Sequence, residues 1–283
     1  MTAVARRSVA SEPRARDLPA GVPTVREARL VVESGQSAVF AAEHFDRGRV
    51  AVKVARPGAG ASIREEAALL TRFANAHLPV VVEAGVTAEG DAYLVTEWID
   101  GRPLSEAVGF GAPLARGTAL RLVAQMCRAL GPLHAGGWVH GDLKAPNHVL
   151  RRDGTLFVID LGLAREAGTT HEGVLGTPQL CAPEVTSGER IGAEADVYSL
   201  GMLLYAMLSG RSPFVEDTFA STTHTWSLDR WRDAHARARP RPLPDTSPAV
   251  TVLSDLVIAC LAKSPTARPA TATVLGKALE AML

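Results

Sequence analysis

The change of pattern at Gly101-Arg102-Pro103 limits what this chain can fold into more than any other feature of the sequence. Before it, short valine-rich runs separated by turn residues predict β-strands over residues 29–32, 38–42, 50–55, 80–84 and 92–97. One helix, over 63–73, is predicted among them from the spacing of Ile63, Ala67, Leu70 and Phe73. After it, longer apolar patterns predict helices over 120–134, 197–208, 253–262 and 272–282.

This order of elements predicts an α+β protein in two parts. We expect a β-rich part over about 25–100 and a mainly helical part over about 101–283, with Gly101-Arg102-Pro103 as a linker. Two short strands, 148–150 and 156–159, are expected inside the helical part, and residues 240–244 as a loop. Residues 1–24 are rich in arginine and lack an apolar stretch, which predicts a disordered leader rather than a secretory signal.

Charge and cysteine usage argue against several classes of function. Lysine plus arginine number 30 and aspartate plus glutamate number 30, so nothing favours nucleic acid or an anionic membrane as partner. No run of about 18 apolar residues is present, so no membrane span is predicted. Cys127, Cys181 and Cys260 form no CxxC pair, which favours buried thiols in a reducing compartment, the cytoplasm, over disulfides or a zinc site.

The most specific chemical signal is the stretch HGDLKAPN, from His140 to Asn147. A predicted hairpin follows and ends at Asp160, which brings Asn147 and Asp160 to the same edge. Phosphoryl transfer needs a group that orients the acceptor hydroxyl and hard oxygen ligands for magnesium. Asp142 suits the first task, and Asn147 and Asp160 the second. Alone, Asp142 is equally well a helix cap, but these residues occur together; His140 is interpreted as a packed structural histidine.

In these residues and in further motifs, the chain resembles the eukaryotic-type (Hanks-type) serine/threonine protein kinase family over about residues 30–283. The motifs, in the family's order, are Ala51-Val52-Lys53-Val54, HGDLKAPN, Asp160-Leu161-Gly162, Gly176-Thr177-Pro178, Ala182-Pro183-Glu184, Asp196 with Gly201, and Arg268. The resemblance implies a two-lobe protein-kinase-like fold, ATP and Mg²⁺ as cofactors, and serine or threonine side chains of proteins as acceptors. Abundant alanine and arginine are typical of a bacterial member.

The resemblance also assigns roles, position by position. The implied catalytic residues are Asp142, Lys144, Lys53 and Glu66, with Glu66 preferred to Glu65 as the partner of Lys53. The implied magnesium ligands are Asn147 and Asp160. The implied nucleotide-binding residues are Val32, Gly35, Val39, Ala51, Lys53, Thr96, Glu97, Ile99 and Leu150. Structural roles are implied for Asp196, which braces the catalytic loop, for a Glu184–Arg268 pair, and for Thr177 beside the catalytic aspartate.

The glycine-rich loop departs from the family pattern. It reads ESGQSAVF from Glu33 to Phe40, and only Gly35 fits the expected glycines. We take Val39 rather than Phe40 as the residue over adenine, and the small neighbours still permit a tight hairpin. If Glu33 faced the phosphates it would repel them. We therefore predict weaker ATP binding than in a typical member.

A second departure is Gly141, which stands where many members have an arginine that binds a phosphate on the activation loop. We therefore predict activity that does not depend on phosphorylation of Thr169 or Thr170.

Two other functions remain open at this point. A small-molecule phosphotransferase of the same fold shares the His-Gly-Asp-Leu stretch but generally lacks the motifs that follow residue 176. A pseudokinase scaffold is favoured by the degenerate loop and opposed by the retained lysine, glutamate, aspartates and asparagine. The substrate, the upstream signal and the oligomeric state have no signature in the sequence.

Overall fold

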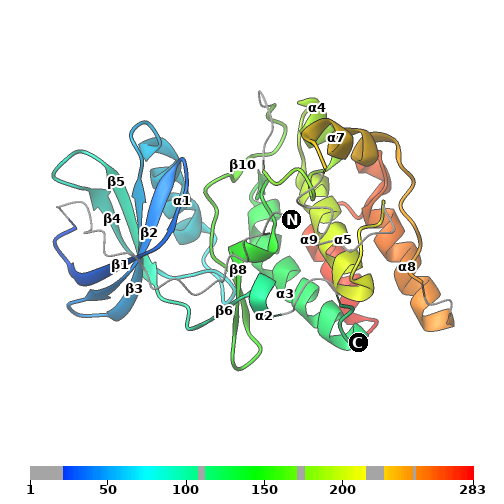
Figure 1. The fold of residues 1–283 in the computed structure, drawn as a ribbon, viewed down its shortest axis with the longest axis horizontal. Coiled ribbons are helices and arrows are strands. Elements are labelled where there is room, and N and C mark those ends of the chain that lie inside the picture. The colour runs from blue at the N-terminus through cyan, green and yellow to red at the C-terminus, as the bar shows by residue number, and fades with distance from the viewer. Residues whose placement is uncertain (1–21, 108–111, 171–175, 215–225, 245–246) are drawn as a thin grey trace, which may run out of the picture. The chain divides into compact units, whose positions relative to one another are not determined.

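The computed structural model of the chain describes residues 22–107, 112–170, 176–214, 226–244 and 247–283 (Figure 1). It divides into two compact units: the first ends at Trp98, and the second contains the residues from Ile99 onward together with Phe73–Leu78. Of the predicted leader, residues 1–24, the first 21 lie outside the described residues. Val22 is 6% exposed and packs in the core of the first unit, so ordered structure includes the end of that segment.

The first unit is an antiparallel sheet with one helix (Figure 1). Its strands are β1 (Val25–Glu33), β2 (Ser37–His44), β3 (Gly48–Ala55), β4 (Val81–Val86) and β5 (Ala92–Glu97), in the spatial order β1-β2-β3-β5-β4. Helix α1 (Gly60–Arg72) packs against β3, β4 and β5. These elements match the strands and the helix predicted from the sequence.

The two faces of this sheet differ, and β3 shows why. Val50, Val52 and Val54 are at most 2% exposed and pack with Phe40 in the hydrophobic core, on what we call the core face. Lys53 alternates with them and points to the other side, which we call the lysine face. Because successive side chains of a strand point to opposite faces, the valine-rich pattern of β3 predicts this division.

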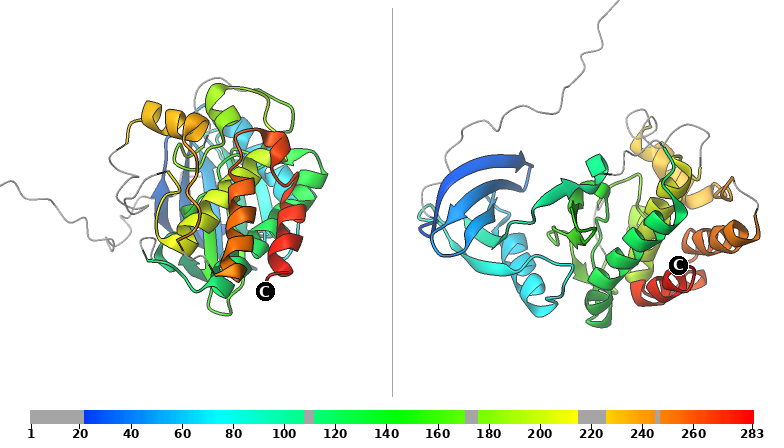
Figure 2. Two further views of the ribbon diagram at one scale, coloured as in Figure 1. Left: turned by 90° about the vertical axis from the view of Figure 1, so that its right-hand side faces the viewer. Right: turned by 90° about the horizontal axis from the view of Figure 1, so that it is seen from below.

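The second unit is mainly helical (Figure 2). Its helices are α2 (Leu104–Ala107), α3 (Arg116–Ala135), α4 (Pro183–Ser187), α5 (Ala193–Ser209), α7 (Leu228–Arg237), α8 (Pro248–Cys260) and α9 (Ala272–Glu280), with 3₁₀ turns at Ala145–Asn147 and Pro265–Ala267. Its strands are β6 (Gly101–Pro103), β7 (Trp138–Val139), β8 (His148–Arg151), β9 (Leu156–Val158) and β10 (Arg165–Glu166). Helix α5 packs against α3, α8 and α9, and α3 against α9. Among the helices described, none has the length and hydrophobicity to cross a bilayer.

Helix α5 is the centre of this unit because it is buried on all sides. Thirteen consecutive residues, from Ala195 to Met207, are buried and most of them are apolar, as expected for a helix in the core. It ends at Ser209, and the φ of 69° at the next residue, Gly210, lies in the left-handed region that glycine adopts without a steric cost.

Two sequence expectations differ from the structure. The predicted linker Gly101-Arg102-Pro103 is strand β6, which pairs with β8. A Cβ on Gly101 would lie 2.5 Å from the carbonyl oxygen of Leu150, so this close pairing needs glycine. Helix α7 was not expected, because Trp231 is the only large apolar residue that it buries and an apolar period is hard to see.

Candidate active site

An ion pair inside the first unit joins two of the predicted catalytic residues. Nζ of Lys53 lies 2.7 Å from Oε2 of Glu66, and Glu66 is 2% exposed. Lys53 comes from the lysine face of β3 and Glu66 from the buried side of α1, so the packing of α1 on the sheet sets the pair. Glu65 is exposed. The structure thus brings Lys53 together with Glu66, as the helix register predicts.

Strand register gathers five predicted nucleotide-binding residues on the lysine face. Val32 pairs with Val39, and Val39 pairs with Lys53. Ala51, two residues before Lys53, pairs with Thr96. Residues opposite one another in neighbouring strands point to the same face, so all five share it. Val32 is 56% exposed, which leaves its side chain accessible to a ligand.

Glu33 points the other way. It pairs with Ala38, which pairs with Val54 on the core face. Its carboxylate forms an ion pair with Arg56, just beyond the end of β3. Glu33 therefore does not repel phosphates bound near Lys53, because the register places its side chain on the core face, away from the lysine face. The prediction of weak ATP binding then depends on the backbone of the hairpin, where Gly35 occupies the open tip.

The side chains of the remaining predicted nucleotide-binding residues contact other parts of the protein. Oε1 of Glu97 accepts a hydrogen bond of 3.0 Å from the N–H of Val80, which ties the end of β5 to β4. In the second unit, Ile99 is 8% exposed and packs with Val149 and Phe157. Leu150 is half-buried in β8. In the family that the chain resembles, the residues at the positions of Glu97 and Ile99 bind the nucleotide through backbone groups. The side-chain contacts of Glu97 and Ile99 are therefore compatible with nucleotide binding.

Asp142 is the hub of the second unit's polar site. Its Oδ2 accepts hydrogen bonds from Nζ of Lys144 and, at 3.2 Å, from Nδ2 of Asn147. Its Oδ1 accepts one of 2.7 Å from Oγ1 of Thr177. The side chain is 6% exposed, and the N–H of Asp142 donates to Nδ1 of His140 at 3.2 Å. Three side-chain donors, two from the 140–147 loop and one from Thr177, hold this carboxylate in one orientation.

Asn147 and Asp160 meet through the β8–β9 hairpin. The N–H of Ile159 donates to the carbonyl of Asn147 at 2.9 Å, which places Asp160 directly after the paired residues. Nδ2 of Asn147 donates to the carbonyl oxygen and the carboxylate of Asp142, so its Oδ1 points away from them. Oδ1 of Asp160 accepts from the N–H of Gly162 at 2.9 Å. An amide oxygen and a carboxylate thus lie at the same edge of the hairpin.

A buried aspartate on α5 holds the start of the HGDLKAPN loop, at His140 and Gly141. Asp196 is 2% exposed and accepts the N–H groups of His140, at 2.7 Å, and Gly141, at 3.0 Å. His134 contacts it at 2.8 Å through Nε2. Because the N–H of Ala272 donates to Nδ1 of His134, the ring carries its proton on Nε2 and donates to Asp196.

These hydrogen bonds decide the charge state of Asp196. Burial raises its pKa, but the hydrogen bond from His134, electrostatic interactions with His134 and His140, and the N–H of Gly141 lower it, so that the net pKa lies below the ordinary value. Asp196 therefore remains a carboxylate that accepts from the loop.

Gly141 and Gly176 are both in the left-handed region, with φ of 78° and 74°. A Cβ on Gly176 would lie 2.4 Å from the carbonyl oxygen of Gly141, so the segment that carries Thr177 approaches the backbone of the HGDLKAPN loop closely. Glycine at both positions allows the contact between Thr177 and Asp142.

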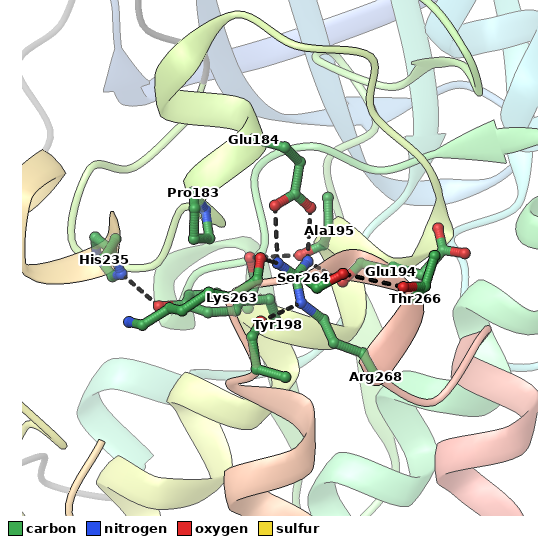
Figure 3. A network of polar contacts seen from close by, with 12 residues as sticks. Pro183, Glu184, Glu194, Ala195, Tyr198, His235, Lys263, Ser264, Thr266 and Arg268 are labelled. Atoms are coloured by element: carbon green, nitrogen blue, oxygen red, sulfur yellow. Dashed lines mark hydrogen bonds and ion pairs between the residues drawn. The ribbon is translucent and has the colours of Figure 1, made fainter. Parts of the chain in front are cut away.

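The Glu184–Arg268 pair is buried and bidentate (Figure 3). The two N–O distances are 2.6 and 2.8 Å, and the residues are 4% and 5% exposed. Arg268 also donates to the carbonyl oxygens of Ala262, Glu194 and Lys263, at 2.7, 3.0 and 3.0 Å. All five of its N–H groups are therefore used, which offsets the cost of burying its charge.

Two further histidines are buried in the second unit. His148 is 0% exposed and its Nδ1 lies 2.7 Å from the carbonyl oxygen of Lys144. Burial lowers its pKa to about 4, with the hydrogen bond to Lys144 opposing and nearby His140 reinforcing the shift. His235 contacts the hydroxyl of Tyr198 at 2.8 Å (Figure 3), and burial and then Lys263 lower its pKa to about 3.

The hydrogen-bond roles of the buried histidines His134, His148 and His235 were not predicted from the sequence. His134 was assigned only to a core helix, although a polar residue at a buried helical position is itself a signal of a specific partner. No local signal predicts that its partner is Asp196, 62 residues away. The part of the cysteine prediction that places all three in the interior is confirmed, and the structure joins none of them in a disulfide.

A family model and two curated relatives are similar to this chain. A family model described as protein kinase domain matches residues 28–279. The serine/threonine-protein kinase Pkn1 of Myxococcus xanthus is 34% identical over 275 residues, which are 91% of this chain and 38% of Pkn1. The serine/threonine-protein kinase PknB of Mycobacterium leprae is 33% identical over 196 residues, 67% of this chain and 30% of PknB.

The chain thus spans less than two fifths of the length of these curated relatives. Among solved structures, the Cydia pomonella granulovirus kinase PK-1 superposes with a TM-score of 0.71 at 21% identity, covering 88% of this chain and 92% of that one. This likeness confirms the predicted fold class, a β-rich unit followed by a helical one.

Proposed function

The chain belongs to the protein kinase domain family, and we propose that it is a serine/threonine protein kinase that transfers the γ-phosphate of ATP to hydroxyl groups of proteins. The observation that carries the proposal is the Asp142 site, where Lys144, Asn147 and Thr177 all donate hydrogen bonds to one carboxylate. Relatives named serine/threonine-protein kinases support the hydroxyl specificity.

Asp142 would orient the acceptor hydroxyl and take its proton. Within the described part of the chain, its Oδ1 accepts one hydrogen bond, from Thr177, so a second lone pair remains for the substrate. The ammonium of Lys144 on Oδ2 adds a positive charge beside the transfer position. Since phosphoryl transfer depends mainly on positioning and charge stabilisation, a carboxylate fixed by three donors fits this task.

The residues present also fit magnesium. Mg²⁺ is bound through one or two carboxylates together with substrate phosphates, and it prefers oxygen. Asn147 and Asp160 offer an amide oxygen and a carboxylate, and would hold the metal. No cluster of three His, Cys, Asp or Glu ligands occurs within the described part of the chain, so a transition-metal site is not favoured there. Bound Mg-ATP would supply the phosphoryl group, and its Mg²⁺ would offset the negative charge of the phosphates.

Lys53 would hold the phosphates of the same nucleotide. Its ion pair with Glu66 keeps the ammonium on the lysine face, with the apolar side chains of Val32, Val39 and Ala51 on that face for the adenine. The backbone of Glu97 and Ile99, with Thr96 and Leu150, would complete the nucleotide site. These assignments extend the family's roles to the matching positions.

The segment after residue 176 favours a protein acceptor over a small molecule. Small-molecule phosphotransferases that share the His-Gly-Asp-Leu stretch generally lack it. Here it is built into the fold, because Glu184 is bound to Arg268 and Thr177 to Asp142. We also propose a cytoplasmic reaction, supported by three cysteines that remain thiols; fractionation of cells that express the protein would test it.

The test is transfer from γ-labelled ATP by the wild type and by Asp142→Asn. The wild type should label proteins rather than aminoglycosides or sugars, and the variant should be about 10²–10⁴-fold slower. Asp153→Asn, at an exposed position in the β8–β9 turn, is the matched control and should keep full activity. Calorimetry should show that both variants bind Mg-ATP.

Label on small molecules alone would establish a small-molecule phosphotransferase. Nucleotide binding without transfer, together with an Asp142→Asn variant that acts normally in cells, would establish a scaffold. A phosphoproteomic comparison of cells carrying the wild type and the variant would identify the substrates.

A further inference from the structure

In the hairpin that replaces the glycine-rich loop, backbone N–H groups donate hydrogen bonds to a side chain of the hairpin itself. The hydroxyl of Ser34 accepts hydrogen bonds from the N–H groups of Gln36, at 3.2 Å, and Ser37, at 3.1 Å. It also donates to the carbonyl oxygen of Ser37 at 3.1 Å, and that oxygen accepts the N–H of Ser34 at 2.8 Å. One side chain therefore satisfies two consecutive backbone N–H groups at the tip.

A separate set of contacts ties this hairpin to the end of β3. The N–H of Arg56 donates to the carbonyl oxygen of Gln36 at 2.8 Å. The side chain of Arg56 forms the ion pair with Glu33 on the core face. These contacts do not involve the hydroxyl of Ser34. The hairpin would therefore keep its position without that hydroxyl, whereas the two N–H groups would lose their acceptor.

Backbone N–H groups in a tight turn form a concave set of donors suited to anions, and phosphate oxygens are strong acceptors. We propose that Ser34 sets the phosphate affinity of this chain: its hydroxyl occupies the N–H groups of Gln36 and Ser37, so a nucleotide must displace it before its phosphates bind them. The inference rests on the proposed function, because it assumes that the phosphates bind at this hairpin.

This competition acts on phosphates and not on the base. The residues proposed for adenine on the lysine face, among them Val39 and Ala51, lie on strand positions that make no hydrogen bond with Ser34. Removing the hydroxyl should therefore strengthen the binding of ATP and ADP and leave the binding of adenosine unchanged. It also gives a physical reason for weak ATP binding that does not depend on the charge of Glu33.

The experiment compares the wild type, Ser34→Ala and Ser34→Thr by calorimetry with Mg-ATP, Mg-ADP and adenosine. Ser34→Ala should bind Mg-ATP about tenfold more tightly than the wild type, since two donors become available to a charged acceptor. Adenosine affinity should change by less than about twofold. Ser34→Thr keeps a hydroxyl at the same place and should behave as the wild type.

A second readout needs no nucleotide. In the unliganded protein, the amide hydrogens of Gln36 and Ser37 should exchange faster in Ser34→Ala than in the wild type or in Ser34→Thr. Thermal unfolding of each variant would show that the fold is kept.

The outcomes separate the two claims. Wild type that binds Mg-ATP, with no gain or a loss in Ser34→Ala, would overturn the role of Ser34 and leave the proposed function standing. An equal gain for adenosine would also overturn it, because the effect would not involve phosphate. Wild type and Ser34→Ala that both fail to bind Mg-ATP would overturn the proposed function, and this inference with it.

Discussion

Replacing His148 by leucine should remove much of the acid sensitivity of this protein's stability. The imidazole is 0% exposed, and its Nε2 has no hydrogen-bond partner in the structure as described. Its Nδ1 contacts the carbonyl oxygen of Lys144, which also accepts the N–H of Asn147 at 3.0 Å. A proton on this ring would therefore place an unpaired charge in the interior, which is why its pKa falls to about 4.

The sign and the size follow from proton linkage. The unfolded chain binds a proton at this histidine with a pKa of 6.5, and the folded chain with a pKa of about 4. Between these values the unfolded state holds more protons, so the stability that is present above the upper value is lost as the pH falls. The slope is about 1.4 kcal/mol per pH unit, which amounts to about 2 kcal/mol between about pH 7 and about pH 5.

The leucine variant should lose this dependence at little cost near neutrality. Because Lys144 keeps the bond from Asn147 and one unsatisfied buried nitrogen disappears, stability at about pH 7 should change by less than about 1.5 kcal/mol. His235, with its pKa lowered to about 3, remains and should leave the variant with about half of the wild-type acid sensitivity.

Urea unfolding at a series of pH values between about 7 and about 5 would measure the effect. His44→Asn is the matched control, because His44 is partly exposed at the end of β2 and Asn can accept the same N–H of Asp46. Equal pH slopes for the wild type and His148→Leu would refute the reasoning, since they would mean that the buried ring is protonated equally in both states.

Three further outcomes are expected. Arg268→Leu should lower the free energy of unfolding by about 3–5 kcal/mol, because Glu184 is left buried and charged, and denaturant titration would detect a smaller loss if the pair were weak. Thr169→Ala with Thr170→Ala should keep turnover near that of the wild type in a steady-state assay; a collapse would show that a phosphate there is needed. Thr177→Val should bind Mg-ATP normally but turn over about 10²-fold more slowly, while Thr177→Ser keeps the 2.7 Å bond to the catalytic aspartate and should be active.

Much of the local structure could be predicted because it follows from local chemistry. The alternation of valines in β3 predicts both a strand and which face holds Lys53. The mostly apolar run of α5 predicts a buried helix. The HGDLKAPN stretch predicts its own chemistry, since Asp142, Lys144 and Asn147 are close in sequence and their contacts span at most five residues.

Other features depended on partners that are distant in the chain. Residues 101–103 read as a linker because a three-residue strand has no pattern of its own; its pairing with β8 makes it a strand. The sequence does not show which face of the sheet carries Glu33, because a shift of one residue in strand register moves a side chain to the other face. The pairing of Glu33 with Ala38 decides it.

The sequence by itself determined the family, the order of the main strands and helices and the residue types that can carry phosphoryl transfer, because these depend on side-chain chemistry and on short-range periodicity. Only the tertiary structure decided which buried polar groups satisfy one another: His134 with Asp196 over 62 positions, and Arg268 with Glu184 over 84. The physical reason is that a buried donor or charge must find a partner, and the partner that it finds depends on how distant segments pack rather than on the residues beside it.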